Sequence, residues 1–311
     1  MSVFFKHNFT ICKFKSSDSN WVILSPIKQR IKEKVEKNGL PLSQWKIKVS
    51  RGILTGCNEA FIISTKKRNE ILNNCLTTNE KNITAELIRP ILRGKDISTY
   101  SINWANLWLI NIPSGYTKIL MSELVEVKTP EQFMKDNFYG IWKHFIEYIN
   151  FEKSKINKKG KGIKNRGDQG NYWWELRSCA YLADFTKQKI IFSEIVQKPQ
   201  FYFDLKGFYP EATCFMIIGE NLNYLIKILN SVLIGFIFKE YYSGGSLGNK
   251  GYRYKKKFLL NLPIPKFDKK NELFLEIINS KDLIAVEKAI LNIFDFDCDE
   301  VEYLETQVLH E

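Results

Sequence analysis

Residues 189–240 read KIIFSEIVQKPQFYFDLKGFYPEATCFMIIGENLNYLIKILNSVLIGFIFKE. Three short apolar runs come first, with the β-branched and aromatic residues of consecutive strands: 189–196, 200–206 and 208–218. Lys206-Gly207 lies between the last two runs and predicts the tip of a hairpin. From 222 to 240 apolar residues recur at helical spacing, which predicts one amphipathic helix. Strands that pass directly into a helix favour the α+β class.

The rest of the chain adds further strands and helices. Short apolar runs predict strands, or a helix end in the second case, at 60–63, 86–92 and 107–112. Helical spacing within 123–153 predicts another helix. Residues 25–39 have clear helix boundaries, because Ser25 can cap the start and Gly39 can end the last turn.

Charge is distributed unevenly along the chain. The 311 residues contain 46 Lys plus Arg against 34 Asp plus Glu, a formal net charge of +12, and the pI is about 9.2. Residues 267–311 carry twelve acidic and four basic residues, a net charge of −8, which leaves +20 for the remainder. Such a basic body favours a polyanionic partner, with nucleic acid ahead of an acidic membrane surface. An ordinary Lys-rich surface gives the same totals, so charge alone does not decide.

The acidic end is predicted to form two helical stretches, 271–294 and 298–309. Its apolar stripe consists of Leu273, Phe274, Ile277, Ile278, Leu283, Ile284, Ile290, Leu291 and Phe294. Phosphate repels acidic helices, so we expect this tail to face away from DNA. The stripe should be buried on the basic body or on a partner protein.

Several kinds of site and segment are missing from the sequence. The six cysteines include no C-x-x-C pair and the three histidines are scattered, which argues against a zinc site and a disulfide framework. Lys6, His7 and Lys13 interrupt the apolar start, unlike a signal peptide. The most apolar run, 232–238, is too short to span a membrane. We therefore expect a cytoplasmic protein without membrane association.

Catalytic motifs are missing as well. An enzyme that methylates a base amino group needs an Asn/Asp-Pro-Pro-aromatic loop to hold the flipped base, and no two of the nine prolines adjoin. Glu194, Asp204 and Lys206 have the residue types of a metal-dependent nuclease. Asp204 and Lys206 fall at the predicted hairpin tip, however, where charged side chains ordinarily face water. We expect no catalytic residue, metal or cofactor in this chain alone.

Two Gly- and Lys-rich loops have the composition of a DNA-contacting surface. The first holds seven basic and no acidic residues between Lys153 and Arg166 and continues through NRGDQGNYWWELR at 165–177. Lys and Arg neutralise phosphates, whereas Arg, Asn, Gln and Asp can also read base edges. A solvated mobile loop would carry the same lysines, and core anchoring is the favoured explanation of the tryptophans. The candidate contacts are Lys158, Lys159, Lys161, Arg166, Asp168, Gln169, Trp173 and Arg177, with Arg253 and Lys255 from the second loop at 243–257.

Two Arg-Gly motifs supply further candidates. In RGILTGCNEAF, residues 51–61, the glycines could let backbone amides and Thr55 approach phosphate or another loop, or could merely satisfy turn dihedrals. In RGKD, residues 93–96, the Asp could orient the Arg through paired hydrogen bonds and leave the Lys for phosphate, or the pair could be purely structural. The candidate DNA contacts from these motifs are Arg51, Thr55, Asn58, Arg93 and Lys95.

These motifs resemble, in order, those of the TaqI-like C-terminal specificity domain. That module recognises DNA targets in single-chain type IIG restriction–modification enzymes and related adenine-specific methyltransferases. The matching blocks are 51–61, 88–97, 168–177, 199–204, 213–214, 229–231, 251–254 and 262–265. The resemblance extends from about residue 20 to residue 306.

The resemblance implies sequence-specific recognition of double-stranded DNA by a bacterial protein that works with a methyltransferase or nuclease domain or subunit. S-adenosylmethionine and Mg²⁺ would then belong only to the parent enzyme. We expect three parts: a lead-in strand and helix that are a remnant of, or a linker from, a methyltransferase-like domain (1–39), a DNA target-recognition domain (40–265) and an acidic helical tail (266–311). Two alternatives stay open. The chain could help complete a split or truncated adenine methyltransferase or endonuclease, or it could bind RNA or polyanions without sequence preference.

Overall fold

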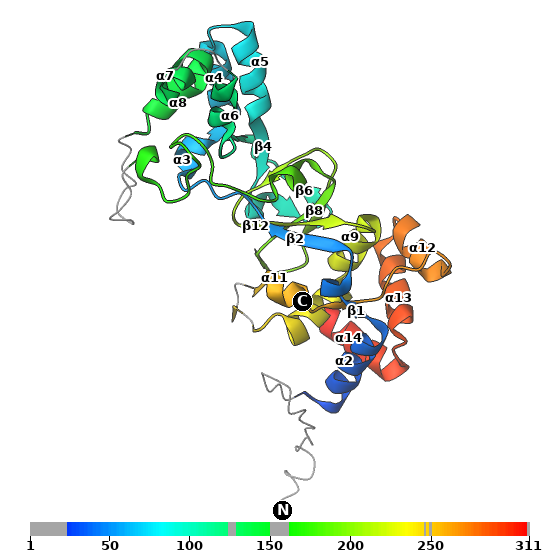
Figure 1. Ribbon diagram of the computed structural model, residues 1–311. Coiled ribbons are helices and arrows are strands. Elements are labelled where there is room, and N and C mark those ends of the chain that lie inside the picture. Colours follow the sequence, from blue (N-terminus) through cyan, green and yellow to red (C-terminus); the bar gives the residue numbers. More distant parts are fainter. Residues whose placement is uncertain (1–23, 124–128, 150–161, 246, 249–250, 310–311) are drawn as a thin grey trace, which may run out of the picture. The chain divides into compact units, whose positions relative to one another are not determined.

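The computed structural model describes residues 24–123, 129–149, 162–245, 247–248 and 251–309 (Figure 1). The chain forms two compact units. Of the described residues, unit 1 contains those from 24 to 47, 195–199 and those from 219 onward, and unit 2 contains those within 48–194 and 200–218. Helices and strands occur in both, which confirms the α+β class. The predicted division at 39 and 265 rests on composition and resemblance rather than on compactness, and it stays a prediction.

One four-stranded sheet of unit 2 has the order β10-β8-β12-β2. Its strands are β2 (Ile47–Arg51), β8 (Lys189–Ser193), β10 (Phe201–Asp204) and β12 (Cys214–Gly219). β8 is antiparallel to both β10 and β12, and all five of its residues are buried. The hairpin predicted at Lys206-Gly207 is therefore wrong, because β10 and β12 lie on opposite sides of β8.

The second four-stranded sheet has the order β11-β4-β7-β3. It consists of β3 (Ile62–Ser64), β4 (Ile88–Leu92), β7 (Leu107–Ile110) and β11 (Tyr209–Pro210), and only the β11–β4 pair is parallel. The strand predicted at 60–63 begins instead as a helical turn, α3 (Asn58–Phe61). Ala60 and Phe61 are both fully buried, and so short a buried run has no periodicity that separates helix from strand.

The described residues of unit 2 also form five longer helices, of which α4, α5, α7 and α8 pack together (Figure 1). Their bounds are α4 (Thr65–Asn74), α5 (Thr78–Leu87), α6 (Tyr116–Ser122), α7 (Pro130–Asn137) and α8 (Tyr139–Ile146). Ser64, Thr77 and Thr129 cap three of them by accepting a backbone N–H three residues ahead. The helix predicted within 123–153 is thus two helices in its described part. The shorter elements are η2 (Gly94–Asp96), β5 (Ile97–Ser98), β6 (Ser101–Ile102), η3 (Ile163–Asn165) and η4 (Leu182–Thr186).

Unit 1 is built from three separate parts of the chain. Its elements are α2 (Pro26–Asn38), β1 (Leu40–Pro41), η1 (Leu42–Gln44), β9 (Ile195–Val196), α9 (Leu222–Asn230), α10 (Val232–Ile237), η5 (Phe238–Tyr242), β13 (Tyr252–Arg253), α11 (Lys256–Leu259), β14 (Pro263–Ile264), α12 (Glu272–Asn279), α13 (Leu283–Phe294) and α14 (Cys298–Leu309). β1 pairs with β14 and β9 with β13. Helix α2 has the predicted extent, but the Ser25 side chain makes no capping bond. Gly39 follows α2 in an extended conformation, and a Cβ there would lie 2.6 Å from the Pro263 side chain, so glycine permits this close approach.

The single helix predicted at 222–240 is broken at Ser231. α9 and the segment Val232–Tyr242 meet at 71°. The Ser231 hydroxyl accepts from the Ile234 amide at 3.2 Å and donates to Glu287 at 2.7 Å. The Glu287 carboxylate also accepts from the Val232 amide at 2.8 Å, so a residue of the acidic tail caps α10. Within the described residues no single helix is long and apolar enough to cross a membrane, although the bent pair reaches that length and composition together.

The acidic tail packs within unit 1. Ile277, Ile290 and Phe294 have no exposed surface, and Lys34 on α2 forms ion pairs with Glu300 at 2.6 Å and Asp297 at 3.4 Å. The stretch predicted at 271–294 is two helices, because Asp282 caps a new helix by accepting the Ile284 amide. Part of the predicted stripe remains outside, since Leu283 is 51% exposed and Ile284 is 67% exposed.

A buried ion pair joins β8 to β10. Lys189 and Asp204 are register partners, their charged atoms lie 2.6 Å apart, and neither side chain is exposed. Burial lowers the pKa of Lys189, while the hydrogen bond and charge of Asp204 act in the opposite direction. The expectation that Asp204 faces water at a hairpin tip is therefore wrong. Its carboxylate forms an ion pair with Lys189 inside the sheet.

We expect Lys189→Met to lower the free energy of unfolding of unit 2 by about 3–5 kcal/mol, because Asp204 would stay buried without its counter-ion. The double change Lys189→Met with Asp204→Leu should cost much less, since no buried charge remains. Urea unfolding followed by circular dichroism measures both. As a control, Lys48→Met removes a more exposed ion pair with Asp184 and should cost less than about 1 kcal/mol. Three equal losses would contradict this account of the sheet.

Candidate nucleic-acid interface

The first Arg-Gly motif, at residues 51–52, is hydrogen-bonded to the turn at 210–214, between β11 and β12. Arg51 Nε donates to the Ala212 carbonyl at 2.9 Å, and the Gly52 amide donates to the Cys214 carbonyl at 2.8 Å. A Cβ on residue 52 would collide with the backbone carbonyl of Glu211. Only glycine permits this approach, so Gly52 places the exposed Arg51 beside the turn.

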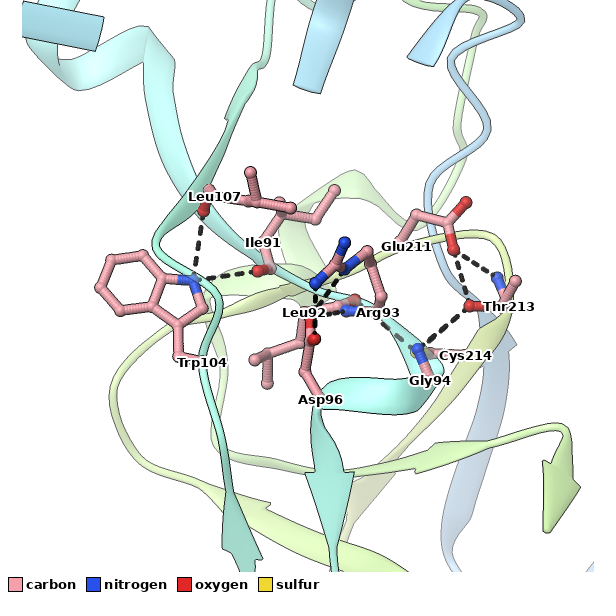
Figure 2. Close-up of polar contacts among 10 residues, drawn as sticks. All are labelled: Ile91, Leu92, Arg93, Gly94, Asp96, Trp104, Leu107, Glu211, Thr213 and Cys214. Atoms are coloured by element: carbon pink, nitrogen blue, oxygen red, sulfur yellow. Dashed lines mark hydrogen bonds and ion pairs between the residues drawn. The ribbon is translucent and has the colours of Figure 1, made fainter. Parts of the chain in front are cut away.

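The second motif closes on the same turn (Figure 2). The Gly94 amide donates to the Thr213 hydroxyl at 3.1 Å, and that hydroxyl donates to Glu211 at 2.6 Å. Arg93 and Asp96 form two side-chain hydrogen bonds, Nε to Oδ2 at 3.0 Å and Nη2 to Oδ1 at 2.8 Å. This bond to Asp96 raises the pKa of Arg93. The paired hydrogen bonds predicted from the sequence are formed, and Lys95 is left exposed.

The Trp-rich loop is held by a buried guanidinium. Arg166 is 6% exposed and donates to the carbonyls of Thr55, at 2.9 Å, and of Trp173, at 3.1 Å, and it also donates to the carbonyl of Glu175. Its guanidinium lies over the Phe61 ring, 4.4 Å from the centroid. Burial lowers the pKa of Arg166 to about 10, so the side chain remains protonated at neutral pH. Arg166 thereby joins this loop to the turn that follows β2.

A buried carboxylate organises the other side of the loop. Glu175 has no exposed surface and accepts the backbone N–H groups of Gly115 at 2.9 Å, Thr117 at 3.0 Å, Asn171 at 2.9 Å and Tyr172 at 3.3 Å. Sequence reasoning did not assign Glu175 a role. The signal was an acidic residue between apolar neighbours, which at a buried position requires several donors.

A pocket of about 380 Å³ opens between this loop and the turn after β2. Residues of three segments of unit 2 line it, from 52–54, 111–114 and 176–182. Asn111 is among them, is 7% exposed, and has a side-chain oxygen without a hydrogen-bond partner among the described residues. Arg177 and Tyr181 also line this pocket.

The sequence profile of the TaqI-like C-terminal specificity domain matches residues 89–264, more than half of the chain. The chain belongs to this family. The match contains RGKD, the turn at 210–214 and the Trp-rich loop, whereas the motif at 51–61 lies before it.

Two solved structures share the fold of this specificity domain. The type IIG restriction endonuclease BpuSI matches with a TM-score of 0.52 at 13% identity over 91% of this chain. The type IIL restriction–modification enzyme MmeI, solved in complex with DNA, matches with a TM-score of 0.52 at 10% identity over 87% of this chain. The matches cover 32% of the BpuSI chain and 36% of the MmeI chain, so this chain spans about a third of either enzyme.

Three side chains predicted to contact DNA form hydrogen bonds within the specificity domain. The Thr55 side chain is 1% exposed and its hydroxyl accepts the Cys57 amide. Arg166 is buried and its guanidinium donates to three carbonyls, so its N–H groups are not available to base edges. Gln169 uses its amide nitrogen on the carbonyls of Lys164 and Arg166, at 3.0 and 2.7 Å. Each side chain stabilises a loop. Thr55 and Arg166 are too buried to contact DNA, which corrects their assignment, whereas the contact predicted for the partly exposed Gln169 stays a prediction.

Other candidates remain at the surface of unit 2. Asn58 is exposed, accepts the Thr55 hydroxyl and lies 3.4 Å from Glu211 through its amide nitrogen. Arg177 and Asp168 form a partly exposed ion pair at 3.1 Å. Trp173 packs against the core and donates to Glu131 at 3.2 Å, in agreement with the anchoring explanation.

The remaining candidates are not among the described residues of unit 2. Lys158, Lys159 and Lys161 lie outside the described residues. Arg253 and Lys255 belong to unit 1, where Lys255 is exposed and its ammonium lies 5.6 Å from the centre of the Phe258 ring. In the part of the chain that the structure describes, no group of three or more His, Cys, Asp or Glu side chains could hold a metal ion.

We expect Arg166→Ala to lower the free energy of unfolding by about 3 kcal/mol, because it leaves buried carbonyls without donors. Any loss of DNA affinity should then be the same for all sequences. Arg177→Ala, nearby and exposed, serves as the matched control and should change stability by no more than about 0.5 kcal/mol. Thermal unfolding and binding to a panel of duplexes measure the two effects. If Arg166→Ala relaxed preference at one base pair without loss of stability, its structural assignment would be wrong.

Proposed function

We propose that this specificity domain binds double-stranded DNA at a defined sequence and supplies target recognition to a restriction–modification enzyme. The observation that carries the proposal is the family match over 89–264, which contains most of the surface just described. The charge of +20 outside residues 267–311 supports a polyanionic partner. We further propose that the protein acts in the bacterial cytoplasm.

Within this proposal, the turn at 210–214 positions cations for the phosphate backbone. Arg51 and Lys95 are exposed on the two Arg-Gly motifs that close on it. Phosphate contacts of this kind fix the register of a protein on the duplex but carry no sequence information. Readout of bases would then come from Asn58 and from Arg177, whose guanidinium is oriented by Asp168.

We also propose that the domain works beside a methyltransferase or nuclease domain. S-adenosylmethionine and Mg²⁺ would bind that catalytic part. The exposed Leu275, Leu283 and Ile284 of the tail give an apolar surface on which a protein domain could pack. The acidic charge of the tail favours a protein neighbour there over phosphate.

Affinity for random duplex DNA should fall steeply with salt, because each neutralised phosphate releases counterions. Changing Arg51 and Lys95 together to Ala should reduce the slope of log affinity against log salt by about 0.9 for each lost contact. Lys269→Ala with Lys270→Ala removes the same charge from the tail region and should leave the slope unchanged. Fluorescence anisotropy over a salt series measures both, and equal slopes for the two variants would refute the placement of phosphate at this turn.

The purified chain alone should transfer no methyl group from S-adenosylmethionine to DNA and should cut no plasmid with Mg²⁺. It lacks the Pro-Pro loop, and the Asp204 carboxylate is bound to Lys189. Assays with radiolabelled cofactor and with supercoiled plasmid test this. Cleavage that disappears in Glu194→Gln, a change at a partly exposed side chain, would favour the nuclease alternative.

A further inference from the structure

Asn58 carries an exposed side-chain amide that two neighbours hold in place. It is the first residue of α3, and its side-chain oxygen accepts the Thr55 hydroxyl at 2.5 Å. Its side-chain nitrogen lies 3.4 Å from Glu211 Oε1. Thr55 is only 1% exposed and Glu211 only 7%, whereas Asn58 is exposed. Asn58 therefore reaches the surface of unit 2, while its two partners do not.

The hydrogen bonds of these partners favour one orientation of the Asn58 amide. Thr55 Oγ1 accepts the Cys57 amide at 3.2 Å and keeps its own hydrogen to donate. Glu211 Oε2 accepts the amide and the hydroxyl of Thr213, at 3.0 and 2.6 Å (Figure 2). An ionised carboxylate only accepts hydrogen bonds, so turning the Asn58 amide over would set its oxygen against Glu211 Oε1.

The turn that precedes Asn58 lies against the Trp-rich loop. Gly56 has a φ of +67°, and a Cβ there would lie 3.1 Å from the Asp168 Cβ, so the two segments touch. The Asp168 carboxylate pairs with Arg177 at 3.1 Å. Asn58 and Arg177, the two side chains to which base readout is assigned, therefore come from segments that are in direct contact.

The hydrogen-bonding groups that remain on Asn58 match those of adenine. A side-chain amide has two N–H donors and two acceptor lone pairs, and the two partners engage one of each. One N–H and one lone pair remain. In the major groove, adenine offers the N6 amine beside the N7 acceptor, whereas guanine offers two acceptors, N7 and O6. An amide of fixed orientation satisfies both groups of adenine but sets its oxygen against O6 of guanine.

We propose that Asn58 recognises one adenine of the target sequence from the major groove, donating to N7 and accepting from the N6 amine. Glu211 is a positioning residue that keeps the Asn58 amide in this orientation. The inference rests on the proposed function, because it requires that this face of unit 2 meets the major groove of DNA.

The test is selection of bound duplexes from a randomised DNA pool by the wild-type chain and by Asn58→Ala, followed by sequencing. We expect the wild-type selection to contain a position at which adenine is preferred about tenfold, or about 1.4 kcal/mol, as one bidentate contact provides. Asn58→Ala should lose the preference at that position alone and keep its affinity for random duplex. Asn171→Ala removes an exposed amide from the Trp-rich loop and, as the matched control, should retain every preference.

Atomic substitution in the DNA tests the contact itself. Replacing the selected adenine by 7-deazaadenine removes the N7 acceptor but keeps the pairing with thymine. The wild-type chain should then bind about fivefold more weakly, as the loss of one hydrogen bond predicts. Asn58→Ala should lose nothing further, because both changes remove the same contact.

A second variant tests the positioning role. Glu211→Gln keeps the size of the side chain, and its amide nitrogen would face Asn58 if its oxygen stays with Thr213. This variant should weaken the adenine preference at the same position, while affinity for random duplex is kept. An unchanged adenine preference in Glu211→Gln would overturn the positioning role.

The outcomes separate the two proposals. If a sequence preference emerges that Asn58→Ala leaves intact, the inference fails and the proposed function stands. If the lost preference is for another base, or if Asn58→Ala weakens binding to all sequences equally, the adenine assignment is overturned. If the wild-type chain binds no duplex or selects no sequence, the proposed function fails and the inference with it.

Discussion

A single buried guanidinium organises the candidate interface. Arg166 binds carbonyls from two distant segments, at Thr55 and in the Trp-rich loop, and so holds together the two sides between which the pocket opens. The buried carboxylate of Glu175 accepts hydrogen bonds from four backbone N–H groups. Only isolated β-bridges occur in the described parts of these loops, so buried side-chain charges satisfy many of their backbone groups. The exposed Arg177 is presented from a loop made rigid by its neighbours.

Burial separates arginines that look alike in the sequence. Arg51, Arg93 and Arg166 each precede a glycine, and the sequence makes each a candidate for DNA contact. Arg51 is exposed, Arg93 is bound by Asp96, and Arg166 is enclosed. The glycines have one effect in common for the first two, because Gly52 and Gly94 both approach the turn at 210–214. These two Arg-Gly motifs therefore make contacts between loops within the domain.

The family, the fold class and most element positions could be predicted from the sequence, because strands and helices have local periodicity and the motifs keep their order. Strand pairing could not, since nothing local to 206–207 tells that β8 inserts between β10 and β12. The helix break at Ser231 also escaped prediction, because its partner Glu287 lies far along the chain. Among site residues, the Arg93–Asp96 pair was foreseeable from its spacing, whereas the enclosure of Arg166 depends on a turn more than a hundred residues away.

The positions of the two units along the chain determine the order in which they can fold during synthesis. All residues of unit 2 have been synthesised once the chain reaches residue 218. Residues 195–199, which lie within this stretch, belong to unit 1. Unit 1 must wait for the tail, because α10 lacks its Glu287 cap and α2 lacks Glu300 until the last helices exist. On the ribosome, the part that carries the candidate DNA surface would thus fold first, while the α9–α10 segment stays exposed and depends on the final residues to cover it.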